Sequence, residues 1–165
     1  MGRILLLAWL ACGAVHAAPD NPLIDYEGFA RNVREVGALR ESRRVSEAEF
    51  IRMAREPGTV VLDARSVRLF ELRHIEGAVN LSFPEFTAET LAAVIASRAT
   101  RVLIYCNNNF LGARESMPAK VAPSALNLST FVSLHAYGYR NVFELGPAVD
   151  VRASRLEFAG MEAAR

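Results

Sequence analysis

The sequence lacks a hydrophobic run long enough to cross a membrane, which needs about 20 apolar residues. Its most apolar stretch, residues 4–11, follows a single Arg3 and leads into small residues up to Ala18. A short run in this setting is typical of a secretory signal peptide. We therefore predict a signal peptide at residues 1–17 and a periplasmic or secreted mature protein. Lipid attachment at Cys12 is the alternative, but Trp9 stands where lipoproteins usually have leucine.

Cysteine is scarce as well, occurring only as Cys12 and Cys106. Exported domains often carry even sets of cysteines joined as disulfides. Removal of the signal peptide would leave Cys106 alone, which excludes an internal disulfide. Three interpretations remain open: an inert buried thiol, an intermolecular bridge, or a reactive nucleophile.

Neither sign of charge dominates the chain. It has 19 lysines and arginines against 18 aspartates and glutamates, and Lys120 is the only lysine. This balance gives no electrostatic basis for binding nucleic acid or an anionic membrane surface. His74 and His135 are isolated from any spaced acid or cysteine, so no metal site is predicted.

What the sequence does contain is an alternation of helical and strand patterns. Residues 18–43 form a predicted N-terminal helical extension, because Tyr26, Phe29, Val33 and Val36 fall at near-helical spacing and should pack on the domain. Ser46 and Glu49 have the spacing of a capping box that starts a second helix. The rest of the chain, residues 44–165, is long enough for one domain with a proper core.

Two runs, at residues 59–63 and 101–105, read as strands buried on both faces, and residues 141–145 give a third strand. Helical patterns at residues 66–73, 87–98 and from Leu128 to about 139 separate them. Such alternation predicts an α/β fold, with a mainly parallel central sheet flanked by helices on both faces. Ligands bind beyond the carboxyl ends of strands in these sheets, and Cys106 follows the middle strand directly.

Four segments, in order, resemble the signatures of rhodanese-like domains. Residues 60–65 resemble an apolar strand that ends in Asp-x-Arg, and residues 71–81 resemble the acid and His-Ile-x-Gly-Ala-x-Asn stretch that follows it. Residues 102–106 match the strand that delivers the catalytic cysteine, and residues 138–146 match the closing strand with its glycine.

The resemblance implies a sulfurtransferase that carries sulfane sulfur as a persulfide on Cys106. Its substrates would be a small sulfur-containing anion as donor and a thiol as acceptor, and no metal or organic cofactor is implied. The loop holding the persulfide would comprise Asn107, Asn108, Asn109, Phe110, Leu111, Gly112 and Arg114. Asp63, Arg65, His74 and Gly77 would give structural support: the first two as a pair after the strand, and His74 by organising the turn at Gly77.

The loop after Cys106 departs from the family's usual Cys-x-x-Gly-x-Arg pattern and contains an insertion at about residues 110–126. Its three asparagines either adopt left-handed conformations that turn N–H groups inward or simply support the turn. Arg114 or Lys120 could replace the missing arginine, or could be solvated charges. A further alternative is a catalytically inactive module that binds a protein partner through the inserted loop.

Two other cysteine chemistries are less consistent with the residues. A phosphatase of the related fold needs an arginine six positions after the cysteine to bind phosphoryl oxygens, and position 112 is glycine. A Cys–His hydrolase would require His74 or His135 within hydrogen-bond reach of Cys106.

Overall fold

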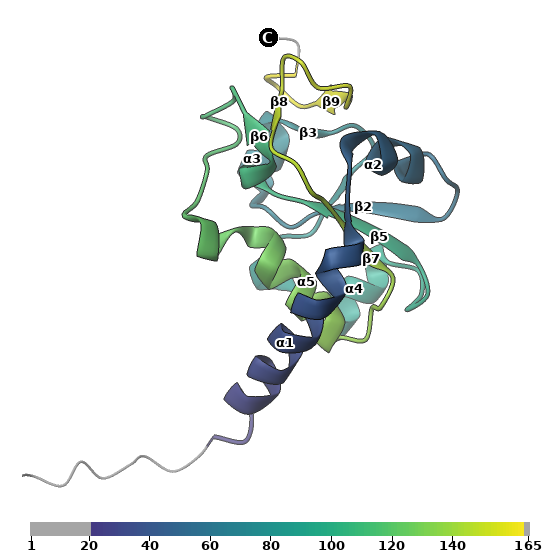
Figure 1. The fold of residues 1–165 in the computed structure, drawn as a ribbon, viewed down its shortest axis with the longest axis vertical. Helices are drawn as coiled ribbons and strands as arrows, with labels where there is room; N and C mark the ends of the chain where they lie inside the picture. The colour runs from purple at the N-terminus through teal and green to yellow at the C-terminus, as the bar shows by residue number, and fades with distance from the viewer. Residues whose placement is uncertain (1–20, 164–165) are drawn as a thin grey trace, which may run out of the picture.

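The structure is a computed structural model that describes residues 21–163. The predicted signal peptide and Cys12 lie outside the described residues. A parallel five-stranded sheet forms the centre of the domain, as predicted (Figure 1). Its strands, in spatial order, are β1 (Arg44–Val45), β7 (Val142–Leu145), β5 (Arg101–Tyr105), β2 (Thr59–Asp63) and β4 (Val79–Asn80).

Side chains on the central strands alternate between two apolar clusters, one on each face of the sheet. On β5, Val102 and Ile104 belong to one cluster, and Leu103 and Tyr105 belong to the other. Strand pleating directs successive side chains to opposite faces, so a continuous apolar run marks a strand covered on both sides. The described helices are α1 (Tyr26–Arg43), α2 (Glu47–Ala54), α3 (Val67–Leu72), α4 (Ala88–Val94) and α5 (Leu126–Ala136).

Helices cover both faces. Buried residues of α1, α4 and α5 lie in the cluster around Ile104, whereas those of α2 lie in the cluster around Leu103. The second face is completed by the segment after β7, which contributes the buried Leu156. The fold class predicted from the sequence is therefore confirmed.

The predicted insertion is more structured than an irregular loop. It begins as β6 (Phe110–Leu111), which pairs in parallel with β8 (Val149–Asp150), and it includes the 3-10 helix η3 (Ala122–Ser124). A second small pair joins β3 (His74–Ile75) to β9 (Phe158–Ala159). Two further 3-10 helices are η1 (Phe83–Glu85) and η2 (Asn107–Asn109).

Local capping explains where two helices begin and end. The Ser46 hydroxyl accepts the Glu49 N–H at the start of α2, as predicted, but the Glu49 carboxylate pairs with Arg52 and leaves the box half formed. The helix predicted at residues 87–98 is shorter, because Ile95 is extended and ends α4 at Val94.

The N-terminal helix is present, but its predicted packing is only partly correct. Val36 is buried, whereas Tyr26, Phe29 and Val33 are exposed. The reason is geometric: only the later turns of α1 cross α5 and β7, and its first half projects away from the domain (Figure 1). None of the described helices, α1 included, combines the length and the apolar character required to cross a membrane.

Gly77 adopts a left-handed backbone conformation, with φ +78°, and Gly37, within α1, offers a matched control. A Cβ added at either position would meet nothing within 4 Å. We expect Gly77→Ala to lower the free energy of unfolding by about 1–2 kcal/mol, through left-handed strain alone. Gly37→Ala should raise it by about 0.5–1 kcal/mol, because alanine is the better helix former. Denaturant titration measures both, and shifts in the same direction would contradict the expectation.

Candidate functional site

Cys106 lies directly beyond the carboxyl end of β5, at the sheet edge where the sequence places it. Its side chain is 2% exposed and borders a cavity of about 250 Å³ that is also lined by residues of α1, α5 and the end of β7. Because side chains alternate along a strand, Cys106 lies on the same face as Ile104, below α1 and α5.

The strand register brings charged side chains onto this same face. Glu144 of β7 pairs with Ile104 of β5, and Arg44 of β1 pairs with Glu144 in turn. Paired residues of neighbouring parallel strands point to the same side of the sheet. Cys106, Glu144 and Arg44 therefore share one face at the carboxyl edge, and all three line the cavity.

Cys106 is the N-cap residue of the short turn η2. The Asn109 side chain accepts the Cys106 N–H at 2.9 Å, and the Asn109 N–H faces the Cys106 side chain while bonding to its carbonyl at 3.1 Å. The N–H groups of Asn107 and Asn108 make no hydrogen bond within residues 21–163. No non-glycine residue of the described chain has positive φ, so the left-handed interpretation of the asparagines is wrong.

The asparagine side chains instead fasten the turn to its surroundings. Asn108 pairs with the backbone of Lys120, accepting its N–H at 3.0 Å and donating to its carbonyl at 2.7 Å, so it anchors the inserted loop. Asn109 donates to the carbonyls of Leu145 at 2.8 Å and Pro147 at 3.2 Å. The turn that carries Cys106 is thus tied both to the insertion and to the end of β7.

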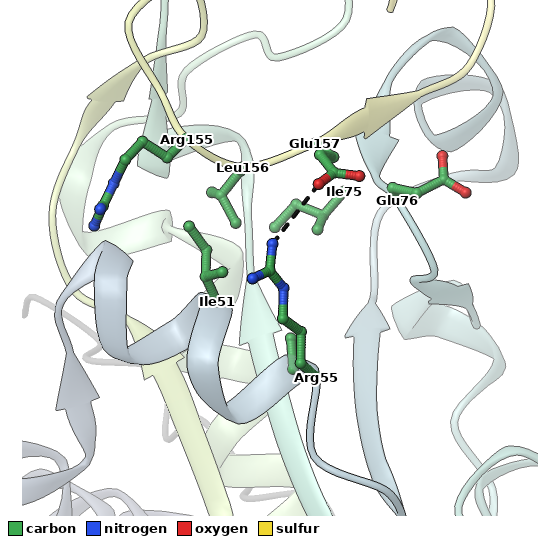
Figure 2. A pocket seen from close by; sticks show the side chains of 8 residues that line it. Ile51, Arg55, Ile75, Glu76, Arg155, Leu156 and Glu157 are labelled. Atoms are coloured by element: carbon green, nitrogen blue, oxygen red, sulfur yellow. Dashed lines mark ion pairs between the residues drawn. The ribbon is translucent and has the colours of Figure 1, made fainter.

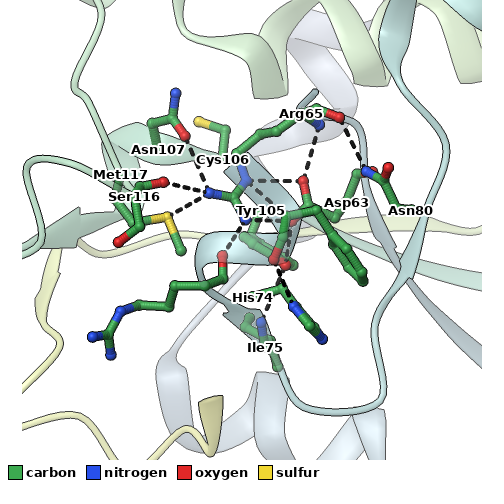
Figure 3. Close-up of polar contacts among 12 residues, drawn as sticks. Asp63, Arg65, His74, Ile75, Asn80, Tyr105, Cys106, Asn107, Ser116 and Met117 are labelled. Carbon is green, nitrogen blue, oxygen red and sulfur yellow. Dashed lines mark hydrogen bonds and ion pairs between the residues drawn. The ribbon is translucent and has the colours of Figure 1, made fainter. Parts of the chain in front are cut away.

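Arg65 is the centre of a buried polar network beside this turn (Figure 3). Its guanidinium binds both carboxylate oxygens of Asp63, with the shortest contact at 2.5 Å. It also donates to the carbonyl of Ser116 at 2.9 Å and to that of Arg73 at 2.7 Å. The Asn107 side chain accepts a longer bond, at 3.4 Å. One side chain therefore joins β2, the inserted loop, α3 and the Cys106 turn.

Asp63 stabilises both the charged form of Arg65 and the protonated form of Tyr105. Burial opposes the charge of Arg65, but hydrogen bonding and attraction by Asp63 outweigh it and raise the pKa of the guanidinium. Burial and the nearby Asp63 charge raise the pKa of Tyr105 well above its usual value. Tyr105 consequently keeps its proton, donates to Asp63 at 2.5 Å and accepts the Ile75 N–H at 3.2 Å.

Two arginines that sequence reasoning missed lie at the cavity. Arg40, at the end of α1, binds Glu144 at 2.5 Å, and Arg44 follows on β1. The spacing of four residues indicates that Arg40 and Arg44 lie on the same side of the end of a helix. No nearby sequence feature indicates that this helix ends at the sheet edge next to Cys106. The positive charge at the cavity comes from the N-terminal helix and β1 rather than from the loop.

The other predicted loop residues lie elsewhere. Phe110 is buried against Tyr105 and Phe158 in the second cluster, and Leu111 is exposed. Gly112, with φ +82°, and the exposed Arg114 border a separate shallow hollow. Of the expected persulfide loop, only Asn108 and Asn109 line the cavity beside Cys106.

The histidines make contacts away from Cys106. His74 stacks on Phe70 and its Nδ1 lies 2.7 Å from the Phe70 carbonyl, so it supports α3 rather than the Gly77 turn. His135 is buried and its Nε2 lies 2.9 Å from Glu35. Neither is hydrogen-bonded to Cys106 in the described part of the chain. Residues 21–163 also contain no group of three or more side chains suited to hold a metal.

A second hollow on the surface has a different character (Figure 2). Ile51, Ile75 and Leu156 form its floor, and the ion pair between Arg55 and Glu157, at 3.7 Å, crosses it. It shares no lining residue with the Cys106 cavity and contains no nucleophilic side chain. The chemistry of the described residues is therefore concentrated at Cys106.

Comparisons with known proteins bear on the fold. The family model described as a rhodanese-like domain matches residues 46–146. A Bacillus halodurans protein of known structure is similar over 82% of this chain and 89% of its own, with 20% identity and a TM-score of 0.54. The rhodanese-like domain of an Anabaena protein is similar over 74% of this chain and 83% of its own, with 18% identity and a TM-score of 0.49. No curated protein sequence matches significantly.

The chain contains the Asp-x-Arg pair twice, buried at Asp63 and Arg65 and exposed at Asp150 and Arg152. We expect Arg65→Met to lower the free energy of unfolding by about 3–5 kcal/mol, because it leaves the Asp63 charge buried without a partner. Arg152→Met should change it by less than about 1 kcal/mol, as for other exposed pairs. Denaturant titration of both variants checks this, and equal losses would contradict it.

Tyr105 should also be visible by titration. Because its pKa is raised in the folded state, the folded protein holds this proton more tightly than the unfolded chain. Stability is therefore unaffected by Tyr105 below about pH 10 and falls as the pH rises further. Phenolate absorbance should be the same for the native protein and Tyr105→Phe until well above pH 10. After unfolding, the variant should lack one phenol near pH 10, and a difference between the native proteins there would refute the expectation.

Proposed function

Because this chain belongs to the rhodanese-like domain family, we propose that it is an exported sulfurtransferase that carries sulfane sulfur as a persulfide on Cys106. The observation that carries the proposal is the cavity at Cys106. A thiol at the carboxyl edge of a parallel sheet borders a space that two arginines, Arg40 and Arg44, also line. The signal peptide predicted at residues 1–17 supports export.

The N-cap position of Cys106 suits the chemistry. A thiolate is the reactive form of cysteine, and backbone N–H groups at the start of a helical turn stabilise its charge. The uncommitted N–H groups of Asn107 and Asn108 and the N–H of Asn109 lie in the turn that follows the sulfur. The same donors can hold a persulfide anion, as an oxyanion hole holds a developing charge. Arg44 attracts an anionic sulfur donor into the cavity.

The reaction with thiosulfate is a sulfur transfer without net oxidation. The Cys106 thiolate attacks the outer sulfur, a new S–S bond forms on Cys106, and the S–S bond of thiosulfate breaks to release sulfite with the bonding electron pair. An acceptor thiolate then attacks the outer sulfur of the persulfide. The Cys106 thiolate leaves, and the acceptor departs as a persulfide.

Intact-mass measurement after thiosulfate treatment tests the proposal. We expect the protein to gain the mass of one sulfur atom, and the gain should disappear with cyanide as thiocyanate forms. Cys106→Ser should gain nothing. An unmodified Cys106 under conditions that load an ordinary rhodanese would refute the assignment.

A pair of arginine variants identifies the source of positive charge. Arg44→Gln should slow loading by thiosulfate on the order of 10-fold, and added salt should reduce the difference. Arg114→Gln, which alters the arginine of the inserted loop, should have a much smaller effect. A larger loss in Arg114→Gln would return the anion site to the loop.

The burial of Cys106 favours a second candidate. The thiol is nearly covered, whereas residues 118–124 of the inserted loop are exposed, including Val121 at 73%. A catalytically inactive module would bind a protein partner through this loop. In that case Cys106→Ser would keep the biological phenotype and deletion of residues 112–123 would lose it, whereas the sulfurtransferase requires loss in Cys106→Ser.

A further inference from the structure

Two buried hydrogen-bond acceptors line the Cys106 cavity without a donor. Glu144 is 2% exposed; its Oε1 binds Arg40, but its Oε2 has no partner among the described residues. Asn127, on the first turn of α5, is 7% exposed and its Oδ1 is also unpartnered. Arg40 also lines the cavity, and its buried Nε is a donor without an acceptor among the described residues. Buried polar atoms of native proteins are nearly always satisfied, so two open acceptors and one open donor at one cavity indicate a ligand that both donates and accepts hydrogen bonds.

The identity of the free Asn127 atom follows from its neighbours. Asn109 donates through Nδ2 to the Leu145 carbonyl, which fixes its Oδ1 toward the Cys106 N–H. The same Oδ1 accepts the Asn127 Nδ2 at 3.1 Å. Since Asn127 must present its nitrogen to Asn109, the atom left free is the oxygen. The cavity therefore contains a carboxylate oxygen and an amide oxygen that both require a donor.

The charges around the cavity complete the pattern. An anion alone would meet the exposed Arg44 and the Nε of Arg40, but it would leave Glu144 Oε2 and Asn127 Oδ1 without donors. An ammonium group satisfies both acceptors and is attracted by the Glu144 charge. Arg44, which pairs with Glu144 in the strand register, offers its guanidinium to a carboxylate on the same molecule.

We propose that the acceptor used at this site is a small zwitterionic aminothiol of the cysteine type, with its ammonium on Glu144 and Asn127 and its carboxylate toward Arg44. This inference rests on the proposed function, since it names the acceptor for the Cys106 persulfide. The aminothiol thiolate attacks the outer sulfur of the persulfide and forms a new S–S bond. The S–S bond to Cys106 breaks, its electron pair returns to the Cys106 thiolate, and the aminothiol leaves as its persulfide.

A panel of acceptors tests the proposal on persulfide-loaded protein. Cysteine is compared with 3-mercaptopropionate, which lacks the amine, and with cysteamine, which lacks the carboxylate. The three thiols also differ in intrinsic reactivity. We therefore define the preference of a protein as its rate constant for cysteine divided by its rate constant for the analogue, and we compare this preference between the native protein and each variant. Glu144→Gln should reduce the preference for cysteine over 3-mercaptopropionate about 10-fold.

Arg44→Gln supplies a second variant that changes an exposed side chain and leaves the Arg40–Glu144 pair in place. It should reduce the preference for cysteine over cysteamine several-fold. The preference for cysteine over 3-mercaptopropionate should stay unchanged. If neither variant changes its ratio, the proposal is wrong.

A binding experiment separates this proposal from the sulfur transfer itself. In Cys106→Ser, the thioether S-methylcysteine should shift the NMR signals of Asn127 and residues 144–146 and bind about 10-fold more tightly than 3-(methylthio)propionate. Equal affinity of the two thioethers would overturn the aminothiol assignment. Selective binding in Cys106→Ser, combined with a native protein whose Cys106 takes no sulfur from thiosulfate, would keep the ligand class and refute the sulfurtransferase.

Discussion

The buried ion pair between Asp63 and Arg65 holds together the segments around Cys106. Asp63 ends β2, and the Arg65 guanidinium reaches from it to the inserted loop, to the end of α3 and to Asn107. Burying two charges is costly unless each is paired and its remaining hydrogen-bonding groups are satisfied. Here the Tyr105 hydroxyl adds a further donor to the carboxylate. The pair thus holds segments that are far apart in the sequence together at one edge of the sheet.

Two different segments share the construction of the cavity. The loop after Cys106 contributes Asn108 and Asn109 to the lining and is held by asparagine side chains, whereas α1 and β1 contribute the arginines. In this arrangement the inserted loop is anchored by Asn108 and leaves its own charged side chains at the surface. The absence of an arginine at the usual position after the cysteine is therefore compatible with a positively charged site.

Sequence reasoning predicted the parts that depend on local pattern. The apolar runs identified β2 and β5, and a shorter apolar pattern identified β7, because strands covered on both faces are mostly apolar. The position of Cys106 followed from the order of those strands. The strand β1, with two residues, has no such pattern, and the destination of α1 depends on long-range packing. Arg44 and Glu144 were missed because only the strand register brings them to Cys106. Arg40 was missed because its position depends on the path of α1.

The path of α1 also determines how short a fragment of this protein can be and still contain the complete cavity. The family match begins at residue 46, after both arginines. A fragment cut at that boundary would keep β5 and Cys106 but would lose β1. It would also leave the buried Glu144 without its cation and open the cavity toward solvent. Loss of the N-terminal helix would then change the charge that lines the cavity without any change in the cysteine loop. The segment that precedes the family match thus determines part of the charge and of the enclosure at Cys106, although it lies about 60 residues or more away from it in the sequence.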